Sequence, residues 1–100
     1  MAQHFNISGE LTQELLAPGS GVNVNKISLV NTHASLLCTV DLYIEKALTG
    51  KFYLMKKVEL PVGVTLIYDD MKFSNASGQF GLYIKLTVAS GIPTVDVIIN

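Results

Sequence analysis

Apolar and polar side chains alternate along much of this chain, most regularly in residues 36–45, LLCTVDLYIE. One parity of this run carries the apolar side chains of Cys38, Val40, Leu42 and Ile44. The other parity carries Thr39, Asp41, Tyr43 and Glu45. A period of two is typical of a β-strand with one face in a core, and β-branched and aromatic residues favour the same structure. The pattern predicts a central strand here.

Further apolar runs predict partners for this strand, at residues 22–31, 51–60, 64–69, 80–88 and 94–99. The alternation slips by one place at Asn25 and Lys26, which indicates a β-bulge or a strand that crosses between sheets. In the run at 51–60, Lys56 is the exception to an otherwise apolar parity.

The first sixteen residues are less regular. Residues 1–9 show no clear periodicity and contain several turn-forming residues, so we expect an N-terminal arm. Residues 10–16, ELTQELL, fit either one helical turn or a strand, and the following Pro18 argues against a long helix. We predict a short strand there. Residues 10–100 then form a single domain of ordinary size.

About seven or eight strands separated by turn signals, with no convincing helix, are typical of a β-sandwich or a closed barrel. We predict an all-β protein built as an antiparallel β-sandwich, jelly-roll-like in its connections.

Composition narrows the classes of partner. Charged residues make up only 15% of the chain and hydrophobic residues 49%, so part of the surface is apolar or polar without charge. The formal net charge is −1 and no basic cluster is present, which argues against nucleic acid and anionic membranes as partners. Cys38 is the single cysteine, so no intrachain disulfide forms. The start has no signal-peptide pattern and no apolar run is long enough to span a bilayer, so we expect a soluble protein folded in a cytoplasm.

Residues that could carry chemistry are few and scattered. Asp69 and Asp70 could offer oxygens to a cation, but no spaced set of ligands follows, and a turn is the favoured interpretation. His4 and His33 have no partner at metal-ligand spacing, which favours solvated or capping roles. Ser, His and Asp occur without a GxSxG elbow or other supporting motif. We predict no enzyme activity, no metal and no cofactor.

Large side chains on the outward parity of the strands are the strongest candidates for a binding surface; they are Tyr43, Tyr53, Met55, Tyr68 and Tyr83. They could form a sugar-binding platform or a protein interface, where Tyr and Met are enriched. We favour the interface, because a sugar site needs more convergent polar groups and Trp is absent. Phe5 and Ile7, the large side chains of the expected arm besides Met1, join this predicted interface.

Four segments together resemble the small virion structural proteins of tailed bacteriophages. They are KISLVNTHAS (26–35), TVDLYI (39–44), KKVELPVGVTLIYDD (56–70) and GLYIKLTVASGIPTVDVIIN (81–100). The resemblance implies a non-enzymatic component of the virion, made in the cytoplasm of the bacterial host. It favours a capsid decoration or cement protein that binds the major capsid protein or another virion protein as a homo-oligomer, with a trimer favoured. A neck, tail or fibre component is the alternative, and a carbohydrate-binding β-sandwich module is a more distant one.

Overall fold

The computed structural model describes residues 3–18, 23–46, 50–69, 73–74 and 80–100. These residues form strands and turns, and no helix occurs among them. The strands are β1 (Gln3–Ser8), β2 (Gln13–Leu16), β3 (Asn23–Val24), β4 (Ile27–Asn31), β5 (Cys38–Lys46), β6 (Gly50–Leu60), β7 (Thr65–Tyr68), β8 (Phe73–Ser74), β9 (Gly81–Thr87) and β10 (Thr94–Ile99).

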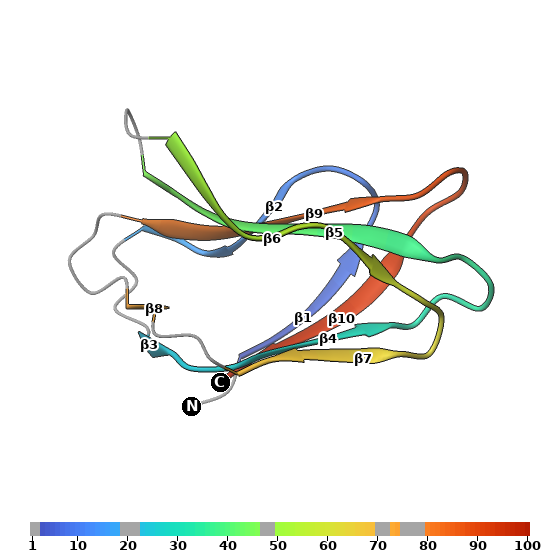
Figure 1. Ribbon diagram of the computed structural model, residues 1–100, viewed down its shortest axis with the longest axis horizontal. Helices are drawn as coiled ribbons and strands as arrows, with labels where there is room; N and C mark the ends of the chain where they lie inside the picture. Colours follow the sequence, from blue (N-terminus) through green and yellow to red (C-terminus); the bar gives the residue numbers. More distant parts are fainter. Residues whose placement is uncertain (1–2, 19–22, 47–49, 70–72, 75–79) are drawn as a thin grey trace.

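Two four-stranded antiparallel sheets face each other (Figure 1). Sheet A has the order β1-β10-β4-β7, and sheet B has the order β2-β9-β5-β6. The chain passes from one sheet to the other between β1 and β2, between β4 and β5, between β6 and β7, and between β9 and β10. This is the eight-stranded arrangement of a jelly roll, with the two-stranded pair β3-β8 added. The predicted jelly-roll-like sandwich is confirmed.

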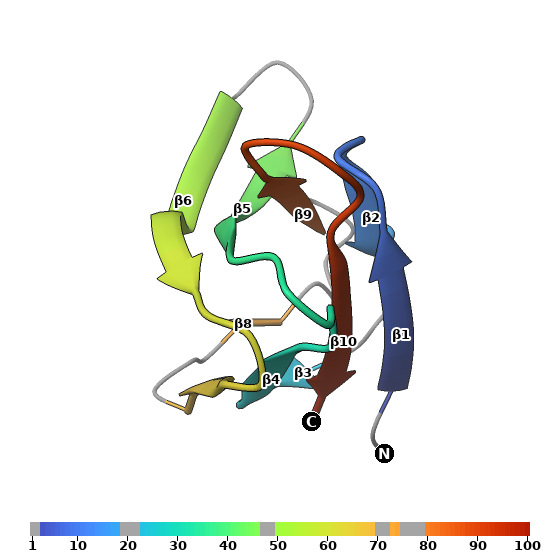
Figure 2. The same ribbon diagram turned by 90° about the vertical axis from the view of Figure 1, so that its right-hand side faces the viewer.

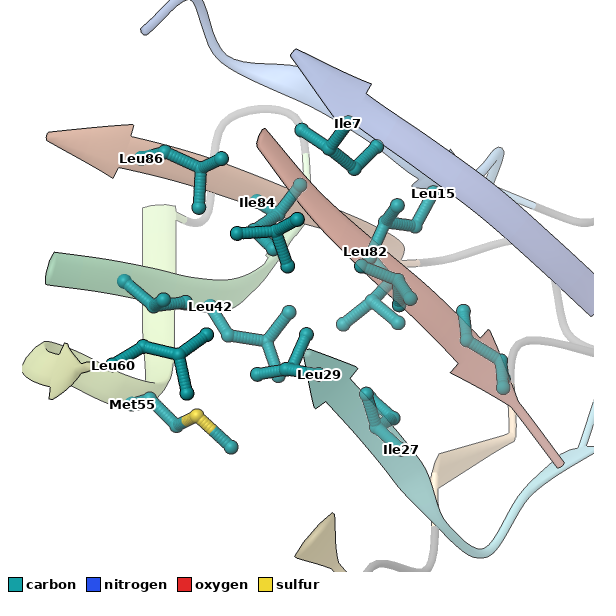
Figure 3. Packing of buried hydrophobic residues seen from close by; sticks show 14 of the residues in the cluster. Ile7, Leu15, Ile27, Leu29, Leu42, Met55, Leu60, Leu82, Ile84 and Leu86 are labelled. Carbon is teal, nitrogen blue, oxygen red and sulfur yellow. The ribbon is translucent and has the colours of Figure 1, made fainter. Parts of the chain in front are cut away.

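The core lies between the inner faces of the two sheets (Figure 3). Fully buried side chains come from both layers: Ile27, Leu29, Val95, Val97 and Ile99 from sheet A, and Val40, Leu42, Leu60, Leu82, Ile84 and Leu86 from sheet B. The period of two predicted the buried side chains of β4, β5, β6 and β9, whereas residues 94–99 were predicted only as a strand. Burying a side chain of this size contributes about 1.5–3 kcal/mol, so this layer is the main stabilising element.

Strand β5 is internal to sheet B, between β9 and β6, as the central-strand prediction requires. Its pairing with β6 is interrupted, because the one residue between Val40 and Leu42 opposes the two residues between Met55 and Val58. This β-bulge explains the parity exception in β6. The backbone of Lys57 takes a φ of 53° there, and its N–H donates to Asp41 Oδ1 at 2.7 Å.

The N-terminal segment differs from the expected arm. Residues Gln3–Ser8 form β1, which pairs with β10 along its whole length and is an edge strand of sheet A. Ile7 is buried in the core and Phe5 packs against it. Two anchors at alternate positions and a complete antiparallel ladder are enough to make this short polar run a strand. Strand β2 (Gln13–Leu16) confirms the strand interpretation for residues 10–16.

Hydrogen bonds from the backbone and from one side-chain amide fix two of the connections between strands. Strand β3 ends before Asn25 and Lys26, whose N–H groups both donate to the carbonyl of Asn100, and β4 then begins in sheet A. The predicted slip is therefore a crossing between sheets. The buried amide of Asn31 donates to the carbonyls of Leu36 and Leu60, both at 2.8 Å. It joins the end of β4 to the end of β6 in the opposite sheet.

Candidate functional site

The most distinctive surface feature is a groove at the open edge of the sandwich. Strand β6 is the edge of sheet B and β7 is the edge of sheet A, so no strand among the described residues covers the gap between them. The groove has a volume of about 250 Å³ and is lined by Leu54, Met55, Val58, Leu66, Ile67 and Tyr68. A single phenolic hydroxyl is the only polar side-chain group in this lining. A surface of this kind binds apolar side chains.

The bulge in β6 determines what enters the groove. Register shifts on both sides of Met55 place this residue opposite the buried Leu42, so the Met55 side chain turns inward and is only 9% exposed. Short strand β7 leaves the neighbouring core positions partly uncovered: Leu66 and Tyr68 are half-buried, and Ile67 is 55% exposed. The groove is therefore a partly open end of the core.

The two edge strands and the turn between them also expose apolar side chains. These are Phe52 on β6, Val62 and Val64 in the β6–β7 turn, and Ile67 on β7. Large apolar patches on a folded protein mark sites of association. Strand β7 adds an unpaired backbone edge with no charged residue, no proline and no register shift against β4. Edges of this kind pair with other chains unless something covers them.

A second feature is a row of tyrosines on the outer face of sheet B. Tyr53, Tyr43 and Tyr83 lie directly opposite one another on β6, β5 and β9. The ring centroids of Tyr43 and Tyr53 are 5.3 Å apart, and those of Tyr43 and Tyr83 are 5.6 Å apart. Contacts at such distances stabilise a sheet by about 0.5–1.5 kcal/mol each.

Lysines cover this tyrosine row. Lys51 Nζ lies 4.9 Å from the centroid of the Tyr43 ring, and Lys56 Nζ lies 4.2 Å from that of Tyr53. Tyr43 is only 3% exposed, whereas Tyr53 is 43% exposed. A sugar-binding platform needs free ring faces, so these covered rings give a carbohydrate site little support. The ring contacts favour a packing role, in which the row joins β6, β5 and β9 on the outer face of sheet B.

Tyr83 also bonds within the protein. Burial raises the pKa of its phenol, and the negative charges of Glu14 and Glu45 and a hydrogen bond with Glu14 raise that pKa further. The group stays neutral and keeps its proton at physiological pH. Burial likewise raises the pKa of the Cys38 thiol, which favours an inert core residue over a nucleophile.

The structure divides the predicted interface residues among three places. Met55 and Tyr68 line the groove. Tyr43, Tyr53 and Tyr83 form the tyrosine row. Phe5 and Ile7 belong to β1, at the opposite edge of sheet A from β7.

The outward orientation predicted for Met55 is wrong, because a register shift in β6 turns this side chain inward. Tyr43 does lie on the outer face of sheet B, but ring stacking and Lys51 cover it, and Ile7 of the expected arm is buried in the core. Sequence reasoning missed Leu54, Val58 and Leu66 as groove residues, because an edge position is not visible in an alternating pattern. The lysine at the parity break of β6 was the available signal.

The His and Asp side chains considered as possible metal ligands do not form a cluster within the described part of the chain. No group of three or more His, Cys, Asp or Glu side chains that could hold a metal ion occurs there. His33 has a capping role, because its Nδ1 accepts the backbone N–H groups of Ser35 and Leu36, both at 3.0 Å. Asp69 is exposed and Asp70 lies outside the described residues. No described helix is long and apolar enough to cross a membrane.

No protein-family model and no curated protein matches this chain in sequence. Solved structures do match its fold. The mitogen of Yersinia pseudotuberculosis gives a TM-score of 0.56 at 13% identity, over 100% of this chain and 85% of that one. The SPBc2 prophage-derived protein YomS gives 0.51 at 11% identity, over 99% and 94%. A chain of the cyanophage Pam1 capsid asymmetric unit gives 0.43 at 13% identity, over 98% and 83%, too weak a likeness to carry an argument. The first two likenesses show a shared fold.

Proposed function

We propose that this protein is a non-enzymatic structural component of a phage particle, and that it joins a neighbouring protein subunit of that particle through the groove between β6 and β7. The observation that carries the proposal is the open edge itself. It combines an apolar groove of about 250 Å³, exposed apolar side chains around it and the unpaired strand β7. Burying such a surface against a partner stabilises the complex by about 25 cal/mol per Å² of apolar area.

Capsid decoration is the specific role that we favour, with the major capsid protein or another virion protein as partner and the virion as location. The support comes from the four segments that resemble virion structural proteins of tailed phages, and three of them supply β4, β5 and the β6–β7 edge. One protein that shares the fold is prophage-derived. A homo-oligomer, with a trimer favoured, is part of the proposal. A neck, tail or fibre component is the alternative place in the same particle.

Binding to particles tests the proposal. Shells and tails of the cognate phage that lack this protein are incubated with the purified chain and sedimented. Wild type is expected to sediment with shells, and Ile67→Asp, which places a charge on the groove, is expected to lose at least about tenfold in affinity, which corresponds to 1.4 kcal/mol. Ile92→Asp is the matched control, because Ile92 is an exposed isoleucine in the β9–β10 connection, outside the groove lining.

Three outcomes separate the alternatives. Sedimentation with tails alone favours the neck or tail role over decoration. Equal binding by Ile67→Asp and wild type overturns the groove as the binding site. Binding of wild type to neither shells nor tails overturns the structural role.

A further inference from the structure

The two long edges of the sandwich differ in charge. Strand β6, at one edge, carries Lys51, Lys56, Lys57 and Glu59, and Lys56 Nζ lies 3.9 Å from Asp41 Oδ2 on the neighbouring β5, so the lysines still outnumber the acids. At the other edge, Glu14 lies on β2 and Glu10 lies in the turn between β1 and β2. Figure 2 shows β1 and β2 on the opposite side of the molecule from β6. One edge is therefore basic and the opposite edge is acidic, although the whole chain has a formal net charge of only −1.

The acidic edge also carries an apolar projection. Leu11 lies in the turn between β1 and β2 and is 82% exposed, more than any other large apolar side chain of the described residues. Two hydrogen bonds from the residues just before Leu11 hold this turn in place. The Gly9 N–H donates to the carbonyl of Pro93 at 3.1 Å, and Glu10 Oε1 accepts the Val88 N–H at 3.0 Å. Leu11 is thus presented to solvent from an anchored turn.

The groove on the basic edge is large enough for this side chain. An apolar cavity of about 150 Å³ accommodates benzene, which has six carbons, and a leucine side chain has four. The groove offers about 250 Å³ and is lined by aliphatic side chains, a methionine and one tyrosine. Docking Leu11 there would remove its exposed surface from water and would cover Ile67, which is 55% exposed.

We propose that the groove binds a second copy of this chain, with Leu11 of one copy seated in the groove of the next and the Glu10–Glu14 edge facing Lys51, Lys56 and Lys57. This inference rests on the proposed function and names the partner of the same groove. Opposite charges at the two edges select this head-to-tail orientation, because pairing two basic edges would oppose like charges. A head-to-tail contact uses different surfaces on the two copies and forms a ring when the rotation closes.

Light scattering coupled to size exclusion tests this contact with the full chain at micromolar concentration. Wild type is expected at a single multiple of the 10.8 kDa chain mass. Leu11→Asp is expected at the mass of one chain, because it places a charge on the projecting side chain. Ile92→Asp, a substitution of another exposed aliphatic residue, is expected to assemble like wild type. Circular dichroism melting of each variant confirms that it is folded.

Mixing two defective variants gives the sharpest readout. Leu11→Asp retains an intact groove, and Ile67→Asp retains an intact Leu11. Each alone is expected to be monomeric, and their mixture is expected to form a one-to-one heterodimer that grows no further. A contact between two identical edges predicts something else: Leu11→Asp would assemble normally. Either normal assembly of Leu11→Asp or the absence of a heterodimer overturns the inference.

A charge exchange tests the orientation. Glu14→Lys and Lys57→Glu are each expected to weaken assembly several-fold, and the double variant is expected to recover it, because the opposite charges then face each other again. No recovery in a folded double variant counts against the proposed pairing of edges. A monomeric wild type overturns the inference altogether. Neither result touches the particle-binding assay, in which Leu11→Asp still binds shells if the groove receives a different virion protein.

Discussion

Replacing Asn31 by alanine removes the polar side chain that joins the two sheets at one end of the sandwich. The Asn31 amide is 1% exposed, and its Nδ2 donates to the carbonyls of Leu36 and Leu60. Its Oδ1 accepts the backbone N–H of His33 at 3.0 Å. The substitution therefore leaves two carbonyl groups and one N–H group without their partner.

The magnitude follows from the burial of those groups. The bond to the Leu60 carbonyl is buried, so its loss costs about 1–3 kcal/mol of desolvation without compensation. The bonds to Leu36 and His33 are partly buried, so water can replace the amide and each loss costs about 0.5–1 kcal/mol. Asn31→Ala is expected to lower the free energy of unfolding by about 3 kcal/mol. For a domain of this size that lowers Tm by roughly 12–24 °C.

Urea denaturation followed by far-ultraviolet circular dichroism measures this loss, since the chain has no Trp for fluorescence. Asn6→Ala is the matched control, because Asn6 also donates from its amide, to Asp96 at 2.6 Å, but at an exposed site. Asn6→Ala is expected to lower the free energy of unfolding by less than about 1 kcal/mol. If Asn31→Ala and Asn6→Ala destabilise equally, the buried amide does not hold the sheets together.

Four further predictions concern stability. Leu42→Ala is expected to lower the free energy of unfolding by about 2–5 kcal/mol, and an unchanged urea midpoint would show that the core is misplaced. Lys57→Gly is expected to raise the free energy of unfolding by about 0.5 kcal/mol and Lys57→Val to lower it, because the backbone φ of 53° at this residue suits glycine and disfavours a β-branched side chain. Equal melting of the two variants would contradict this. Deletion of residues 1–8 is expected to abolish cooperative melting, since β1 buries Ile7, and an intact melt would make the segment dispensable. The pKa of Tyr83 is raised in the folded state, so its contribution to the free energy of unfolding is complete below about pH 10 and is lost as pH rises further. Urea midpoints at pH 8 and pH 11 are therefore expected to differ less in Tyr83→Phe than in wild type.

The alternating pattern by itself determined most of the fold. The inward parity of Val40, Leu42 and Leu82 to Leu86 identified core strands, because a period of two allows only one face to be buried when the other carries polar groups. Turn residues separated the runs. The slip at Asn25 and Lys26 predicted either a β-bulge or a crossing between sheets, and the structure shows that the chain leaves β3 there and enters sheet A.

Tertiary structure alone decided which strands lie at the edges and which side chains meet. The pattern of residues 1–9 is too short and polar to be distinguished from an arm, and only pairing with β10 makes it a strand. Met55 carried the same outward parity as Tyr53, but a second register shift between these two residues places Tyr53 opposite Tyr43 and Met55 opposite the buried Leu42, because one extra residue reverses the side chains that follow it. The groove itself exists because β6 and β7 end different sheets, and strand order is set by long-range pairing that no local period encodes.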